Sequence, residues 1–146
     1  MNQAIADFCS CRFVAFVGVS RQKHKWGNQA FRELKRRGLR VLPVHPSLPT
    51  VDGGPCYGAL DRLPERPEGV VICVQSAKVP PLLRQAAALG IGRVWLQQGA
   101  ESDEATRVAQ ELNLSLAEKA CILMHAPPVR GFHRVHRGLM RLFGRL

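Results

Sequence analysis

The amino-acid sequence predicts a doubly wound α/β protein, in which a mainly parallel five-stranded sheet carries helices on both faces. Short apolar runs alternate along the chain with segments in which apolar residues recur at helical spacing. Such alternation is typical of parallel strands joined by helical crossovers. A length of 146 residues, of which 46% are hydrophobic, indicates one domain whose core requires neither a metal nor a disulfide.

The first strand is predicted at residues 13–17, which are all apolar and end at Gly18. A continuous apolar run of this length is typical of a parallel strand buried on both faces. A basic loop at residues 20–25 follows, and then a segment with apolar residues at helical spacing. We expect this helix to end at Gly38, because glycine readily adopts the left-handed conformation that follows many helices.

The second strand is predicted at residues 40–44. Because Pro43 cannot donate a hydrogen bond to a neighbouring strand, this strand lies near an edge of the sheet or ends early. Residues 47–67 are rich in proline, glycine and aspartate, which predicts an irregular connection with one short helical turn at 59–63. A connection of this length often carries function.

Three further strands are predicted at residues 70–74, 93–96 and 114–116. A helix that begins at residues 75–77 and ends at Gly90 separates the first two of them. An acidic helix start precedes the last strand, and Ser102 is its predicted N-cap.

The charge balance is strongly basic: 21 Lys and Arg against 11 Asp and Glu give 21 − 11 = +10. This balance excludes a disordered acidic chain and a neutral surface. No stretch approaches the roughly 20 apolar residues of a membrane span, and the first ten residues do not resemble a secretory signal, so we expect a cytoplasmic protein. Five cysteines without a CxxC pair predict free thiols, with a metal or disulfide role for Cys9 and Cys11 as the less favoured reading.

A ligand site is expected where the parallel strands end, because ligands of open α/β sheets bind beyond the carboxyl ends of the strands. The four turns at these ends are Gly18-Val19-Ser20, Val44-His45-Pro46, Val74-Gln75-Ser76 and Leu96-Gln97-Gln98-Gly99. They are rich in small and hydrogen-bonding residues and poor in acids. No His, Cys and Asp set for covalent catalysis is evident in them.

The loop after the first strand predicts an anionic ligand. Gly18 permits a tight turn, the next helix offers unpaired N–H groups, and the loop carries Arg21, Lys23, His24 and Lys25. Neither a GxGxxG fingerprint nor a P-loop is present. The second strand ends without the acid that usually holds the ribose of NAD, which favours a nucleotide with an extra phosphate and leaves NADP open. A merely solvated basic loop is the alternative.

The order of these residues resembles the small bacterial and archaeal coenzyme A-binding proteins, whose Rossmann-like domain also begins the succinyl-CoA synthetase alpha subunit. The resembling pieces are Val17-Gly18-Val19-Ser20, Lys25 with Gly27, Gly38-Leu39-Arg40-Val41, Pro43-Val44-His45-Pro46, residues 54–57 and 70–74, Val94-Trp95-Leu96-Gln97-Gln98-Gly99, and Cys121. They span residues 13 to about 122 in the family's order.

The resemblance implies coenzyme A bound across the strand ends, with its phosphates and adenosine against the first loop and the turn after the second strand. Pantetheine would approach the turn after the fourth strand. The implied cofactor-binding residues are Gly18, Val19, Ser20, Arg21, Lys25, Gly27, His45, Pro46, Val74, Gln75, Ser76, Gln98 and Gly99. The synthetase's phosphorylated histidine belongs to a second domain that this sequence does not contain, so ligase activity is not implied. His45 stands where the family often has Asn, and it either contacts the ligand or caps its own turn.

The C-terminal segment is basic and amphipathic. Residues 130–146 carry five arginines and no acid, with apolar residues at helical spacing. We expect residues 1–128 to form the coenzyme A-binding domain and 129–146 a basic amphipathic helix or tail. The tail either docks on the sheet or on a second subunit of a homo-oligomer, or it contacts a membrane surface or a polyanion.

We therefore expect a protein that binds coenzyme A or acyl-CoA without catalytic machinery, as a carrier, sensor or assembly subunit. An NADP-dependent or acyl-CoA-using enzyme is the alternative from another class, disfavoured because the strand ends offer no nucleophile with an orienting partner. A basic polyanion-interaction module that acts through the tail is the third reading.

Overall fold

The computed structural model describes residues 2–127, so the predicted tail lies outside the described residues. Its main sheet has the strand order β2-β1-β5-β6-β7, and every pair in it is parallel. The strands are β1 (Phe13–Val17), β2 (Arg40–Val44), β5 (Gly69–Ile72), β6 (Arg93–Leu96) and β7 (Ser115–Ala117). The helices are α1 (Gln3–Cys9), α2 (Trp26–Arg36), α3 (Val79–Ala88) and α4 (Asp103–Glu111). The predicted fold class is confirmed.

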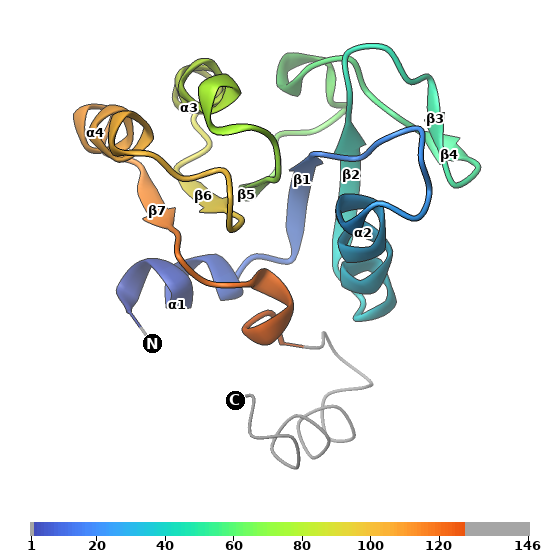
Figure 1. The fold of residues 1–146 in the computed structure, drawn as a ribbon, viewed down its shortest axis with the longest axis horizontal. Helices are drawn as coiled ribbons and strands as arrows, with labels where there is room; N and C mark the ends of the chain where they lie inside the picture. The colour runs from blue at the N-terminus through green and yellow to red at the C-terminus, as the bar shows by residue number, and fades with distance from the viewer. Residues whose placement is uncertain (1, 128–146) are drawn as a thin grey trace.

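Helices cover both faces of this sheet (Figure 1). Alternate residues of each strand point to opposite faces, so β1 sends Val14 and Phe16 to one core and Ala15 and Val17 to the other. The first core packs against α1 and α2, and the second packs against α3 and α4. The sheet is therefore buried on both sides, which explains the continuous apolar runs of its central strands.

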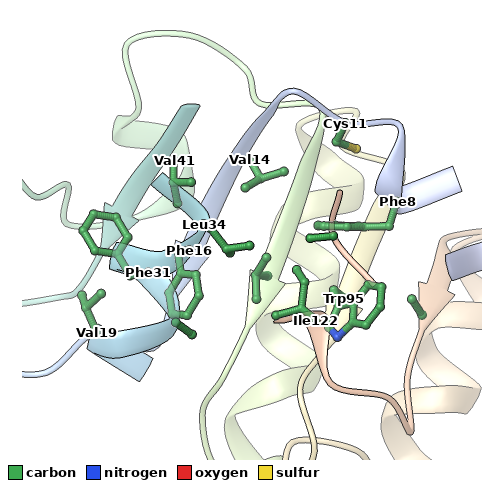
Figure 2. Close-up of a cluster of buried hydrophobic side chains, with 14 of the residues drawn as sticks. Phe8, Cys11, Val14, Phe16, Val19, Phe31, Leu34, Val41, Trp95 and Ile122 are labelled. Atoms are coloured by element: carbon green, nitrogen blue, oxygen red, sulfur yellow. The ribbon is translucent and has the colours of Figure 1, made fainter. Parts of the chain in front are cut away.

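Aromatic residues fill the first core (Figure 2). Phe16 and Phe31 meet edge to face with their ring centroids 6.0 Å apart, which fixes α2 on the sheet. Trp95 is fully buried, and Phe8 of α1 packs edge to face against it at 5.6 Å. The indole N–H of Trp95 donates to the carbonyl of Ala120 at 3.3 Å, so this buried polar group has a partner.

The predicted helix ends are confirmed. The Ser102 side chain accepts a hydrogen bond from the Ala105 N–H and caps α4. Gly38 follows α2 with φ of 93°, and Gly90 follows α3 with φ of 78°. Both glycines therefore adopt the left-handed conformation that ends a helix. The edge position expected for the second strand is also confirmed, because β2 lies at one end of the strand order.

Three local features differ from expectation. Helix α1 was not predicted; its Asn2 cap accepts from the Ile5 N–H, and only two of its residues are buried, so its apolar signal is short. Within the stretch expected to be irregular, β3 (Thr50–Val51) and β4 (Gly54–Pro55) form a hairpin. Asp52 and Gly53 have φ of 51° and 80°, as a tight turn with two left-handed residues requires. The third strand of the main sheet ends at Ile72, two residues before its apolar run does.

Three short 3-10 turns complete the fold: η1 (Leu60–Arg62), η2 (Ser76–Lys78) and η3 (Ile122–Met124). The predicted helical turn at 59–63 corresponds to η1. The helix expected to open at residues 75–77 begins with η2 and continues as α3. Within residues 2–127, no helix is long and apolar enough to cross a membrane.

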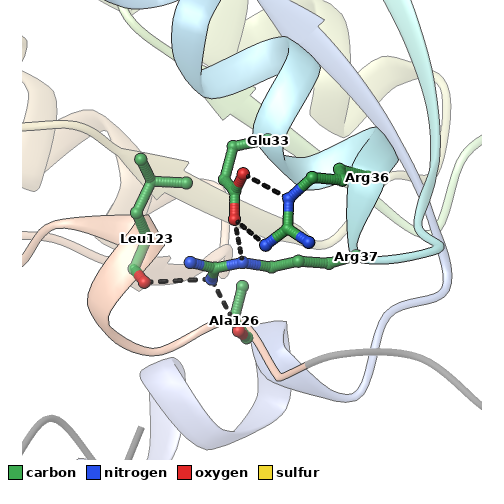
Figure 3. A network of polar contacts seen from close by, with 5 residues as sticks. All are labelled: Glu33, Arg36, Arg37, Leu123 and Ala126. Atoms are coloured by element: carbon green, nitrogen blue, oxygen red, sulfur yellow. Dashed lines mark hydrogen bonds and ion pairs between the residues drawn. The ribbon is translucent and has the colours of Figure 1, made fainter. Parts of the chain in front are cut away.

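A buried arginine fastens the last described segment to α2 (Figure 3). The Arg37 guanidinium donates from Nη1 to the carbonyls of Leu123 and Ala126, each at 2.9 Å, and from Nε to Glu33 at 3.0 Å. Arg36 also binds the Glu33 carboxylate, at 2.7 and 2.8 Å. Hydrogen bonds from Arg36 and then from Arg37 lower the pKa of Glu33 to about 2. The carboxylate therefore stays charged over the physiological range.

Candidate functional site

The strand order reverses direction between β1 and β5. The chain passes from β1 outward to β2, and later returns to the other side of β1 as β5. Loops diverge at such a point and leave a crevice beyond the strand ends. A cavity of about 640 Å³ lies there. Its lining residues are Val17, Gly18, Val19, Val44, His45, Pro46, Gly58, Ala59, Leu60, Cys73, Val74, Gln75, Lys78, Leu82 and Gln85.

Two glycines bring the backbone together beneath this cavity. Gly18 has φ of 145°, and a Cβ there would lie 2.5 Å from the carbonyl oxygen of Cys73 and 2.7 Å from its Cβ. A Cβ on Gly27 would overlap the carbonyl oxygen of Gly18. Gly27 is fully enclosed at the start of α2, so its role in this structure is close packing of the helix on the loop. The loop after β1 is thereby pressed between β5 and α2.

A buried asparagine holds the loop. Asn28 is 1% exposed; its Oδ1 accepts from the Ser20 N–H at 2.7 Å, and its Nδ2 donates to the Ser20 carbonyl at 2.9 Å. The Ser20 hydroxyl accepts from the Gln22 N–H at 3.1 Å. Within residues 2–127, the N–H groups of Gly18, Val19 and Arg21 donate no hydrogen bond. These three donors at the mouth of a tight turn are available to an anion.

His45 caps its own turn and also lines the cavity. Its Nδ1 accepts from the N–H groups of Ser47 and Leu48 at 3.1 and 3.2 Å. Burial, and then the positive charges of Arg21 and Lys78, lower the pKa of His45 below 6.5. The imidazole is therefore neutral at pH 7, and its proton resides on Nε2. Both roles expected for His45 are consistent with this geometry, because the turn occupies one ring nitrogen and leaves the other.

Cys73 follows β5 and lines the cavity. Its side chain is half-buried and packs against the first core. Burial, with a smaller contribution from Cys121, raises the pKa of the Cys73 thiol above 9. The thiol is therefore protonated at pH 7 and is a weak nucleophile. All five cysteines lie in the described part of the chain and are free, as expected.

A second cavity of about 420 Å³ lies between the basic loop and the β3-β4 hairpin. Ser20, Arg21, Lys23 and Asn28 line it on one side, and residues 48 and 50–53 line it on the other. Arg32 braces this region, because it donates to the Lys23 carbonyl at 2.7 Å and pairs with Asp52 at 3.4 Å.

The structure brings together most of the predicted site residues. Six of them line the main cavity, namely Gly18, Val19, His45, Pro46, Val74 and Gln75. Ser20 and Arg21 line the second cavity. Lys25 is the exposed N-cap residue of α2, and it is followed by Trp26, which is 40% exposed. Ser76 begins η2 and lines neither cavity.

The turn after β6 is built differently from the other three. Gln98 and Gly99 are exposed and line neither of the two cavities. Gln97 is 5% exposed, and its Oε1 accepts from the Ile122 N–H at 3.1 Å. The Gly99 N–H donates to Glu101 at 3.0 Å. The buried glutamine therefore anchors the chain after β7, while its neighbours face outward.

Sequence reasoning missed four kinds of cavity residue: Asn28, the 58–60 loop, Lys78 and the α3 side chains Leu82 and Gln85. The spacing of Lys78, Leu82 and Gln85 on one helical face was a usable signal. The approach of residues 58–60 was not readable, because it depends on the bridge between Val44 and Tyr57.

The capping role of His45 gives a stability prediction. His45→Ala leaves the N–H groups of Ser47 and Leu48 without their acceptor and is expected to lower the free energy of unfolding by about 1 kcal/mol. His45→Asn is expected to retain most of this stability, because an asparagine side chain can also accept a hydrogen bond from the N–H two residues ahead. Urea unfolding of both variants measures this. Equal losses in the two variants would contradict the capping role.

A parallel sheet of this order, with a cavity at its reversal point, has the architecture in which doubly wound α/β domains bind ligands. Residues 12–127 match the model of the CoA binding domain, and the chain belongs to this family. The resemblance noted in the sequence is thereby confirmed, and with it a coenzyme A-binding class of domain.

Individual proteins are similar to this chain in sequence or in structure. The chain is 25% identical over 138 residues to an acetate–CoA ligase (ADP-forming) of Archaeoglobus fulgidus, which matches 92% of this chain but 20% of the ligase. A conserved hypothetical protein from Pyrococcus furiosus has a similar structure, with a TM-score of 0.73 and 30% identity over 77% of this chain and 97% of that one. A dinucleotide-forming acetyl-coenzyme A synthetase of Ca. Korarchaeum cryptofilum matches with a TM-score of 0.61 and 26% identity over 70% of this chain and 25% of its own.

Proposed function

We propose that this chain binds coenzyme A or acyl-CoA in the main cavity and acts as a carrier, sensor or assembly subunit without catalysis of its own. The observation that carries the proposal is the cavity itself: it lies at the reversal point of the sheet, and no Asp or Glu lines it. A polyanionic nucleotide would meet backbone N–H groups and cations there, rather than repelling carboxylates.

In this proposal, different groups of the predicted residues contact different parts of coenzyme A. The loop from Gly18 to Arg21 receives the phosphates, assisted by the unpaired N–H groups and by Lys25. His45 and Pro46 on one side, and residues 74–76 on the other, form walls for the adenosine. Gln98 and Gly99 lie along the path of the pantetheine arm.

Binding without chemistry is supported by the state of the reactive groups. His45 is not free to act as a base through Nδ1, because that nitrogen already accepts hydrogen bonds from its own turn. Nε2 carries the proton of the neutral ring, so it is a hydrogen-bond donor and not a base. The Cys73 thiol has a raised pKa. No carboxylate lines the cavity to orient either group. The cavity therefore holds donors for recognition rather than an activated nucleophile.

Calorimetric titration of the reduced protein with coenzyme A tests the proposal, with ATP and NADP as competitors at two salt concentrations. Gln75→Glu places a carboxylate on the cavity wall and is expected to weaken coenzyme A binding about tenfold or more. Gln110→Glu adds the same charge on the exposed surface of α4 and is expected to change the affinity by less than about twofold.

Saturable binding of coenzyme A, which ATP and NADP displace only weakly, would support the site. Absence of binding, or equal salt-sensitive binding of every polyanion, would overturn it. Turnover of an acyl-CoA by the pure protein would overturn the noncatalytic part alone and favour the enzyme alternative. Polyanion contact through residues 129–146 stays a prediction, because those residues lie outside the described part.

A further inference from the structure

Two of the free cysteines lie at the same end of the main sheet. Cys73 directly follows β5, and its side chain packs against the first core. Cys121 immediately precedes η3, in the chain that follows β7. Both residues are half-buried. Cys73 can be reached by small molecules, because it forms part of the wall of the main cavity.

Hydrogen bonds on either side of Cys121 fasten it to the end of β6. The indole N–H of Trp95 donates to the carbonyl of Ala120 at 3.3 Å. The N–H of Ile122 donates to Oε1 of Gln97 at 3.1 Å. Trp95 and Ile122 both lie in the first core (Figure 2). The segment that carries Cys121 is therefore held over the first-core face of the sheet by two successive side chains of that face.

The strand register places these two side chains beside Cys73. Trp95 is the partner of Val71 in the pairing of β5 with β6. One step further, the N–H of Gln97 donates to the carbonyl of Ile72 at 3.0 Å, so the pairing continues past the ends of both strands. Position 97 therefore lies next to position 73, and the side chain of Gln97 carries the Cys121 segment above Cys73.

Two further observations agree with this placement. Burial raises the pKa of the Cys73 thiol, and the charge of Cys121 raises it further. The turn after β1 presents no side chain to Cys73, because Gly18 lies there, and a Cβ on Gly18 would be 2.7 Å from the Cβ of Cys73. The thiol of Cys73 is thus left with the Cys121 segment as its neighbour on the first-core face.

We propose that Cys73 and Cys121 form a reversible intramolecular disulfide and that a small-molecule disulfide is the oxidant. One cysteine thiolate attacks a sulfur of the small disulfide, which releases one thiolate and leaves a mixed disulfide on the protein. The second cysteine thiolate attacks the protein sulfur of that bond and releases the other. The two leaving thiolates take up the protons that the two cysteines lost, and the exchange requires no bound coenzyme A.

Cys9 and Cys11 are the other close pair, and their surroundings disfavour the same reaction. Cys11 is 4% exposed, so an oxidant has little access to it. The Cys9 thiol donates to the carbonyl of His125 at 3.4 Å. A disulfide between the two would also span Ser10, whose N–H completes the end of α1. We therefore expect oxidation at Cys73 and Cys121 first.

Equilibration of the reduced full-length protein with glutathione and glutathione disulfide at pH 8 tests the assignment. Free thiols are then alkylated, and the disulfide is located by peptide mass spectrometry. The chain is expected to lose two of its five thiols to one bond between Cys73 and Cys121, which dithiothreitol reverses. A disulfide forms only where two Cα atoms approach within about 7 Å, so the bond itself checks the placement.

Serine variants identify the partners. Cys73→Ser and Cys121→Ser are each expected to lower the yield of intramolecular disulfide about tenfold or more. Cys56→Ser removes another half-buried thiol and is expected to leave the yield unchanged. Circular dichroism checks that each variant is folded, and the mapping of the unaltered protein decides the question without them.

Three results would overturn the assignment. The first is retention of all five thiols at the most oxidising glutathione ratio. The second is a bond that joins Cys9 to Cys11, or two chains to each other, in place of the expected one. The third is a loss of yield in Cys56→Ser as large as that in Cys73→Ser. None of these results bears on coenzyme A binding, which the calorimetric titration measures separately on the reduced protein.

Discussion

Replacement of Gly18 by alanine is expected to lower the free energy of unfolding by about 3 kcal/mol or more and to abolish coenzyme A binding. The new Cβ would lie 2.5 Å from the Cys73 carbonyl oxygen, which belongs to rigid backbone beyond β5. The φ of 145° is also one that side chains rarely adopt. The loop after β1 must move to relieve the steric overlap and the backbone strain, and its unpaired N–H groups would move with it.

Gly53→Ala is the matched control. Gly53 also has a positive φ, of 80°, but a Cβ there meets nothing within 4 Å. The Gly53→Ala substitution is expected to lower the free energy of unfolding by about 1 kcal/mol, from backbone conformation alone. Urea unfolding followed by tryptophan fluorescence measures both variants, and calorimetry of the folded fraction measures binding. Equal losses for the two variants, or a Gly18→Ala protein that binds normally, would contradict the close packing beneath the cavity.

Arg37→Met is expected to cost about 3 kcal/mol of unfolding free energy. The side chain of Arg37 is 11% exposed, and methionine would leave the carbonyls of Leu123 and Ala126 without a donor. Glu33 would keep Arg36 as its partner, so the loss arises mainly from the carbonyls of the last described segment. The loosened segment contacts the first core through Ile122 and Ala126.

Arg36→Gln removes the other cation from the same carboxylate. Because the side chain of Arg36 is 59% exposed, its ion pair is screened by water, and the expected loss is below about 1 kcal/mol. Thermal and urea unfolding of the two variants under the same conditions make the comparison. A loss for Arg36→Gln as large as that for Arg37→Met would show that charge on Glu33, rather than attachment of the segment, determines the effect.

Periodicity was sufficient to predict the five parallel strands and their intervening helices, because burial on both faces leaves an unmistakable apolar run in each central strand. It was insufficient for α1, which buries only Ile5 and Phe8. The β3-β4 hairpin was missed although Asp52-Gly53 is a strong turn signal, because its strands of two residues each carry no alternation. Short elements depend on tertiary contacts that local sequence does not record.

Some residues of the candidate site could likewise be predicted from the sequence, and others could not. Residues that closely follow strands, such as Gly18, His45 and Gln75, were predictable because topology brings all carboxyl ends to one edge. Asn28 was not, since it reaches the site from the start of α2, whose orientation is set by packing. Gly27 was predicted as a ligand contact from resemblance; in the structure it packs against Gly18, and its contact with the ligand stays a prediction.

The central claim is that coenzyme A occupies the edge of the sheet where the strands end, between β1 and β5. Backbone amide NMR of the ¹⁵N-labelled protein during a coenzyme A titration tests it most directly. The largest shifts are expected at Gly18, Val19 and Arg21, while Arg40 and Arg93, which begin their strands at the opposite edge, stay unchanged. Shifts concentrated at the opposite edge, or spread evenly over the basic surface, would contradict the account.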